Sequence, residues 1–117
     1  MKQHVPERRK VKRRKFAYYM QVLNDDTLEL VGHLSDISPG GFKLDSALSL
    51  PRGQEIPLRM ELTSDVAEVP YVVFIGRTKW CATDPLTPNM NNIGFEIAEI
   101  LPDDRAILDR VMEKYGT

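Results

Sequence analysis

A dense run of basic side chains near the N-terminus is the first feature of this chain that could bind a charged ligand. Residues 1–15 contain eight Lys or Arg residues and one acid, a formal charge of +7, whereas residues 16–117 contain eight basic and sixteen acidic residues, a formal charge of −8. The guanidinium group of Arg holds a phosphodiester through paired N–H donors, and it can also pair with O6 and N7 of guanine. Such an arm also fits a solvated tail, or nonspecific contact with nucleic acid or a membrane.

The second feature is the sequence Asp-Ile-Ser-Pro-Gly-Gly from Asp36 to Gly41, which predicts a tight turn. The Asp36 carboxylate can accept hydrogen bonds from N1–H and the exocyclic amine of guanine, and the Ser38 hydroxyl can donate to a phosphate or a base. Gly40 and Gly41 permit positive φ and would let backbone N–H groups approach an anion closely. The same residue types also form ordinary links between strands, so this segment points to a ligand only together with the basic run.

The order and spacing of these two features resemble the PilZ family, which comprises small bacterial β-barrel domains that bind cyclic di-GMP. The resemblance depends on Arg9-x-x-x-Arg13 followed by Asp36-x-Ser38-x-x-Gly41, and on the pattern of strands around them. Each motif alone is common, but the combination in this order is much more specific.

The resemblance also implies roles for single residues of the arm. Arg9 and Arg13 correspond to the two motif arginines, with Arg14 as the alternative to Arg13 because basic residues follow one another there. Arg8 corresponds to a further arginine that, in this family, accompanies binding of cyclic di-GMP as a stacked, intercalated dimer. The expected ligand site comprises Arg8, Arg9, Arg13, Asp36, Ser38, Gly40, Gly41 and Trp80.

Trp80, the only tryptophan of the chain, has two interpretations. Some PilZ domains place an aromatic residue here against a guanine face, and the pair Gly94-Phe95 fits the last strand of the family. A core position is an equally good interpretation, because large aromatic side chains are usually buried in part.

Short strands account for most of the remaining sequence. Alternating or branched apolar residues predict strands within residues 16–23, 28–34, 42–44, 56–62, 71–80 and 93–97. In the second of these, Leu28, Leu30 and Leu34 form the expected inward row. Gly32 interrupts that row, which predicts a bulge or a close approach of another backbone.

The C-terminal residues change to helical spacing, with an apolar stripe that ends at Tyr115, and they predict a helix over residues 102–115. We therefore predict an all-β fold, a small six-stranded antiparallel β-barrel of the PilZ-like, split-barrel type, with a flexible basic N-terminal arm and one C-terminal α-helix. A single PilZ-like domain over residues 1–117 would divide into the arm at 1–15, the barrel at 16–100 and the helix at 102–115.

Several classes of function are disfavoured by the composition. No apolar run approaches the roughly 20 residues that span a bilayer, and no apolar segment follows the basic start as in a signal peptide. A single cysteine, Cys81, fits a cytoplasmic protein. His4 and His33 lie far apart with no neighbouring ligands, so we expect no metal. We also expect no enzymatic activity, because no P-loop and no paired general acid and base are present.

We predict a bacterial cyclic di-GMP receptor or effector domain that takes part in motility or exopolysaccharide regulation. Ligand binding would order the arm over the barrel and change the surface offered to an unidentified protein target. One alternative is a PilZ-fold interaction module that acts without nucleotide. A weaker alternative is nucleic-acid binding through the basic arm, against which the acidic charge of the body argues.

Overall fold

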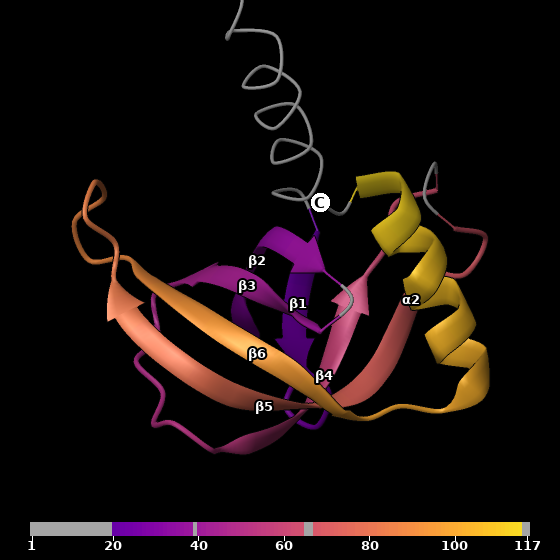
Figure 1. Ribbon diagram of the computed structural model, residues 1–117, viewed down its shortest axis with the longest axis horizontal. Coiled ribbons are helices and arrows are strands. Elements are labelled where there is room, and N and C mark those ends of the chain that lie inside the picture. Colours follow the sequence, from indigo (N-terminus) through magenta and orange to yellow (C-terminus); the bar gives the residue numbers. More distant parts are fainter. Residues whose placement is uncertain (1–19, 39, 65–66, 116–117) are drawn as a thin grey trace, which may run out of the picture.

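The computed structural model describes residues 20–38, 40–64 and 67–115, which form a six-stranded β-barrel with one helix (Figure 1). The arm at 1–15, with Arg8, Arg9, Arg13 and Arg14, and the predicted start of the first strand at 16–19 lie outside these residues. The elements are β1 (Gln21–Asn24), β2 (Leu30–Ser38), β3 (Gly41–Ser46), β4 (Glu55–Glu61), β5 (Tyr71–Thr83), β6 (Asn91–Glu99) and α2 (Pro102–Tyr115).

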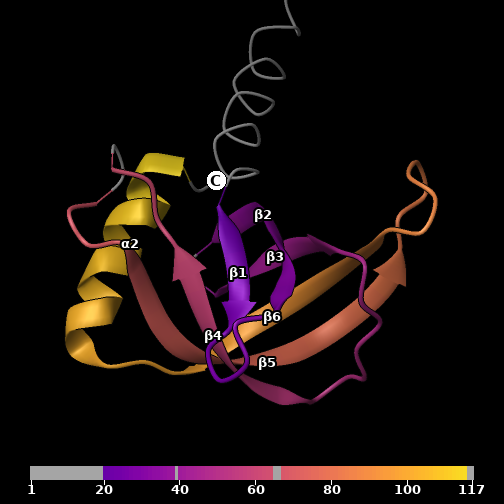
Figure 2. The ribbon, with the colours of Figure 1, turned by 180° about the vertical axis from the view of Figure 1, so that it is seen from behind.

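The strands close into a barrel in the order β1-β2-β3-β6-β5-β4, and every neighbouring pair is antiparallel. Figure 2 shows β1 between β2 and β4, where it completes the ring. Consecutive strands are neighbours except at the connection from β3 to β4, so β6 lies beside β3. The predicted fold class, an antiparallel barrel followed by a helix, is confirmed.

The barrel interior is filled by alternate side chains of each strand, as the pleat of a β-strand requires. In β4 the inward residues are Ile56, Leu58 and Met60, all buried as their alternation predicts. Phe95 of β6 stacks on Phe42 of β3, with ring centroids 5.2 Å apart. Burial of this apolar surface is the main stabilising term for a domain of this size.

Helix α2 lies at one end of the barrel, and the loop between β5 and β6 lies at the opposite end of the molecule (Figure 1). The first turn of α2 is favourable because Pro102 suits the first helical position, and Asp103 and Asp104 lie at the positive end of the helix dipole. Leu108 and Val111 are fully buried against the barrel. The helix predicted over residues 102–115 is thus confirmed at both ends.

The inward row predicted for the second strand is wrong in its first half. Leu28 and Leu30 are 54% and 46% exposed, and Val31 points into the core instead. Leu28 precedes β2 and has φ of 64° in the turn after β1, so the strand alternation does not include it. The prediction for Gly32 is confirmed: a Cβ there would lie 2.6 Å from the backbone oxygen of Asp45 on β3.

The turn predicted from Asp36 onwards is shorter than expected. Asp36 pairs with Lys43, and Ser38 pairs with Gly41, so Asp36 and Ser38 are the end of β2 rather than parts of the turn. The two strands therefore join through residues 39 and 40 alone. This arrangement fixes the Asp36 and Ser38 side chains on the sheet surface, where strand geometry sets their direction.

Gly41 is needed for a different reason from the predicted one. Its φ is not positive, so the freedom of glycine to adopt positive φ is not used here. A Cβ at Gly41 would instead overlap the carbonyl oxygen of Phe95, because β3 and β6 approach closely at this point. Gly40 is exposed, and a Cβ there would meet open space.

Candidate functional site

Four residues form a row across the outer face of the barrel. Asp36 of β2 pairs with Lys43 of β3, Lys43 pairs with Gly94 of β6, and Gly94 pairs with Trp80 of β5. We call these four residues the aspartate row. Since neighbouring strands lie about 4.8 Å apart, the row brings together residues that are far apart in the sequence.

A second row runs beside the first, two residues away on β2, β3 and β6 and three residues away on β5, where a bulge lies between the two rows. Ser38 pairs with Gly41, Gly41 pairs with Glu96, and Glu96 pairs with Arg77. We call these four residues the serine row. Together the two rows place the Asp36-x-Ser38-x-x-Gly41 motif and Trp80 on one patch of the outer surface.

Two β-bulges turn the key side chains outward. Leu34 and Thr78 point into the barrel, so strict alternation would also turn Asp36 inward on β2 and Trp80 inward on β5. The pairing register shifts between Leu34 and Asp36, and again between Thr78 and Trp80, so each strand contains one extra residue. Bulges of this kind commonly redirect a side chain next to a binding site.

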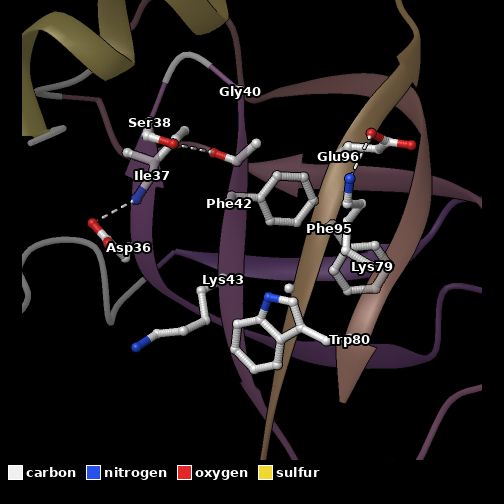
Figure 3. Close-up of a pocket in the computed structure, with 12 residues that line it drawn as sticks. Asp36, Ile37, Ser38, Gly40, Phe42, Lys43, Lys79, Trp80, Phe95 and Glu96 are labelled. Carbon is white, nitrogen blue, oxygen red and sulfur yellow. Dashed lines mark hydrogen bonds and ion pairs between the residues drawn. The ribbon is translucent and has the colours of Figure 1, made fainter. Parts of the chain in front are cut away.

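The two rows border a hollow with a volume of about 330 Å³, the Trp80 hollow. Figure 3 shows Asp36 and Ser38 on one side of it, Trp80 on the other, and Lys43 between them. Five residues predicted to bind ligand line this hollow, namely Asp36, Ser38, Gly40, Gly41 and Trp80. The remaining lining residues are Ile37, Phe42, Lys43, Lys79, Gly94, Phe95 and Glu96.

The polar groups on the β2 side of the hollow are only partly engaged. Oδ1 of Asp36 accepts a hydrogen bond of 2.9 Å from the backbone N–H of Ile37, which orients the carboxylate. The Ser38 hydroxyl donates to the carbonyl oxygen of Gly41 at 3.5 Å, which is longer than an ordinary O–H···O hydrogen bond and therefore weak. Both side chains therefore retain the capacity to bond a ligand.

The aromatic side of the hollow depends on a glycine. A Cβ at Gly94 would overlap the indole of Trp80, so the ring lies directly against the backbone of β6. Trp80 is 45% exposed, which excludes the core interpretation of this residue. Its position on the rim leaves an aromatic face on which a planar base could stack.

The charged residues on the β5 and β6 side form a chain of ion pairs. Nη1 of Arg77 lies 2.6 Å from Oε2 of Glu96, and Nζ of Lys79 lies 3.5 Å from Oε1 of the same carboxylate. Arg77 also pairs with Glu55 of β4 at 2.5 Å. The hydrogen bond from Arg77, aided by the charge of Lys79, lowers the pKa of Glu96 below its ordinary value.

The predicted arginines of the arm lie outside the described residues, but the point where the arm joins the barrel is described. The backbone N–H of Leu34 donates to the carbonyl oxygen of Met20, and Gln21 pairs with His33. Because β1 and β2 are antiparallel, the described end of the chain at Met20 lies beside Leu34, two residues before Asp36 on β2. The arm is thus attached beside the Trp80 hollow.

Sequence reasoning missed four residues around the hollow. Lys43, Lys79 and Glu96 line it, and Arg77 pairs with Glu96. Lys43 directly follows the inward Phe42 on β3, and Glu96 follows the inward Phe95 on β6, so alternation alone could have placed both on the outer face. Lys79 follows the inward Thr78 on β5, so alternation could have placed it outward as well, whereas the outward direction of Trp80 depends on the bulge.

Two further searches concern metals and membranes. Within the described residues, no group of three His, Cys, Asp or Glu side chains is placed to hold a metal ion. In the same part of the chain, no helix has both the length and the apolar composition that a membrane span requires.

Comparisons with known proteins point to one family. The family model described as PilZ domain matches residues 7–114, which is nearly the whole chain. No curated protein matches significantly. Among solved structures, the inhibitor of motility MotI/DgrA of Bacillus subtilis is similar in fold, with a TM-score of 0.60 and 21% sequence identity. The match covers 81% of this chain and 45% of that protein, so the chain spans less than half of its length.

Proposed function

The chain belongs to the PilZ domain family, a family of cyclic di-GMP receptors, and from this premise we propose that it is a cytoplasmic receptor for cyclic di-GMP. PilZ domains are ligand-binding and effector modules, generally without enzymatic activity. One observation carries the proposal. The strand register brings Asp36, Ser38, Gly41 and Trp80 together around one hollow, and the arm that contains the motif arginines is attached beside it.

The barrel side of the hollow would recognise a guanine base. The Asp36 carboxylate accepts hydrogen bonds from N1–H and the exocyclic amine, which adenine does not offer in the same arrangement. The Trp80 ring stacks on the base from the other side of the hollow. Ser38 and the backbone N–H groups near Gly40 and Gly41 bond the remaining polar atoms of the base or a phosphate.

The arm would supply the charge for the two phosphates. Arg13 is seven residues before Met20, and seven extended residues reach about 25 Å, which is ample for the hollow. Arg8, Arg9 and Arg13 close over the ligand, and the +7 charge of residues 1–15 is partly neutralised by the phosphates. With Arg8 before the motif, two stacked ligand molecules are the expected stoichiometry.

Closure of the arm would change the surface that the domain offers to a protein target. The empty domain shows an open hollow on the β2-β3-β6-β5 face, whereas the occupied domain would show the arm there, an order–disorder switch. The similarity to a motility inhibitor fits an output through a protein partner in motility or exopolysaccharide control. Because ordering the arm costs free energy, the affinity is expected to be well below the sum of the contacts.

Isothermal titration calorimetry of the full chain with cyclic di-GMP tests this proposal. We expect binding that weakens with added salt, a stoichiometry of two, and no binding of cyclic di-AMP. Arg9→Ala and Arg13→Ala should each reduce affinity about 30-fold or more, as expected for lost hydrogen bonds between charged groups. Lys2→Ala, which removes an arm charge outside the motif, is the matched control and should change affinity less than about threefold.

The same series separates the alternatives. No heat with cyclic di-GMP at low salt, or unchanged binding by the Arg9 and Arg13 variants, would refute the receptor proposal. If Arg14→Ala lowers affinity and Arg13→Ala does not, Arg14 is the second motif arginine.

A further inference from the structure

On the basis of the receptor function proposed above, we propose that the Glu96 carboxylate competes with the ligand phosphates for Lys79. Glu96 pairs with Lys79 in the empty domain and thereby lowers the affinity for cyclic di-GMP. Among the described residues that line the Trp80 hollow, Glu96 and Asp36 are the acids. Asp36 has a role in recognising the base. Glu96 has no such role in recognising the base, and its negative charge borders the hollow that is proposed to bind a dianion.

The position of Glu96 makes this competition direct. Its Cα is the pairing partner of Gly41, and it would lie 3.2 Å from a Cβ built on that glycine. A phosphate held by backbone N–H groups near Gly41 would therefore lie about one strand spacing from the Cα of Glu96, and the carboxylate of that residue lines the same hollow. At such a distance, like charges repel measurably even near the protein surface.

The two cations next to Glu96 hold it with different strength. Arg77 makes a short contact of 2.6 Å from the side away from the hollow, because it also pairs with Glu55 of β4. Lys79 makes a contact of 3.5 Å, and its side chain is 53% exposed at the β5 bulge. Arg77 can therefore keep the carboxylate in place while Lys79 moves from Glu96 to a phosphate.

The charge balance of the hollow supports the same conclusion. Its described lining contains two acids, Asp36 and Glu96, and two bases, Lys43 and Lys79, so the barrel side has no net positive charge. The attraction for phosphate then depends on the arm. Glu96 thus makes binding conditional on the arginines of the arm, since the barrel wall alone cannot attract a dianion.

Calorimetry with cyclic di-GMP on the full chain and on Glu96→Gln tests this inference. We expect the variant to bind about threefold to tenfold more tightly, with a steeper salt dependence, because one repulsive charge is removed. Glu55→Gln is the matched control: it removes the other carboxylate on Arg77 without changing the hollow, and should alter affinity less than about twofold. Thermal melting of both variants shows whether the fold is retained.

A double-mutant cycle with Lys79→Met excludes a purely structural role. Lys79→Met should weaken binding more in the Glu96→Gln background than in the wild type, because without the Glu96 carboxylate Lys79 meets a phosphate without first breaking an ion pair. Equal affinity of the wild type and Glu96→Gln, or no coupling to Lys79, would overturn this inference and leave the receptor function standing. Absence of binding in both proteins would overturn the receptor function as well.

Discussion

Two of the hollows on the barrel are of similar size and very different chemistry. The Trp80 hollow has a volume of about 330 Å³ and combines an aromatic ring, two acids, two lysines and a hydroxyl. A second hollow near the turn between β1 and β2 is larger, about 400 Å³, and exposes leucines such as Leu30 and Leu48. We call it the leucine hollow; its residues are Asn24, Glu29, Leu30, Val31, Leu48, Leu50, Gln54, Glu55, Ile56 and Pro57.

This difference shows that volume does not identify a binding site for a nucleotide. The leucine hollow could cover apolar surface but offers few groups that distinguish one base from another. The Trp80 hollow gathers its groups from four strands through the pairing register and two bulges. The bulges at Ser35 and Lys79 turn the side chains of Asp36 and Trp80 to the outer face of the barrel, beside the other groups of the hollow.

Among the variants that test the contrast between the two hollows, substitution of Asp36 is expected to have the largest effect on affinity. Asp36→Ala should reduce the affinity for cyclic di-GMP about 30-fold to 100-fold, because two hydrogen bonds to a charged acceptor are lost. Glu29→Gln, in the leucine hollow, should leave the affinity within about twofold. Calorimetry on both variants measures the contrast. Equal losses would show that the two hollows are not functionally distinct.

The next effect tests the aromatic side of the site. Trp80→Ala should weaken binding about tenfold, the value of one base stacked on an aromatic ring. Tyr71 is an aromatic control on the same strand, because it is 39% exposed and packs against Arg59 away from the hollow. Tyr71→Ala should not change the dissociation constant, and an unchanged constant for Trp80→Ala would remove stacking from the proposed mode of binding.

A smaller effect separates the site from the scaffold through two glycines. Gly94→Ala should displace the Trp80 indole, a movable side chain, and lower affinity about fivefold with little change in melting temperature. Gly32→Ala, next to Val31 of the leucine hollow, meets the backbone of Asp45 instead and should lower the free energy of unfolding by about 1–3 kcal/mol without changing affinity. The opposite pattern would contradict the assigned roles.

The smallest expected effect is on the pH dependence of stability, and it tests whether the ion pairs of Glu96 stabilise the fold. The pKa of Glu96 is lowered in the folded state by Arg77, so its contribution to stability is present at neutral pH and is lost as the pH falls below about 4. Melting curves at several pH values should therefore show a slightly steeper acid loss for the wild type than for Glu96→Gln. Identical pH dependence of the two proteins would mean that the ion pairs of Glu96 do not stabilise the fold.

The barrel and helix could be predicted from the sequence because periodicity reports burial directly. The apolar alternation of β4 is confirmed by the burial of Ile56, Leu58 and Met60, and the helical stripe by the burial of Leu108 and Val111. The failure at Leu28 and Leu30 has a local cause. A turn with positive φ at Leu28 precedes the strand, and β2 then begins in the opposite phase.

The candidate site was predictable in part. Asp36, Ser38 and Gly41 were identified from their spacing, and the structure places them with Trp80 around one hollow. Lys79 was not identified, although its place after the inward Thr78 puts it on the outer face; alternation could not show the outward direction of Trp80, because the bulge adds a residue without any signal in the sequence pattern. The reason for glycine at position 41 could not be predicted either, since the approach of Phe95 on a distant strand requires it and local sequence does not encode that contact.

The single tryptophan has a practical consequence for the study of this protein. Because Trp80 is the only indole in the chain and lies on the rim of the hollow, all of the tryptophan fluorescence comes from this one position. A purine that stacks on the ring would alter the emission, whereas a partner that binds at the leucine hollow would not touch the fluorophore. The unlabelled protein therefore carries its own optical probe of ligand occupancy.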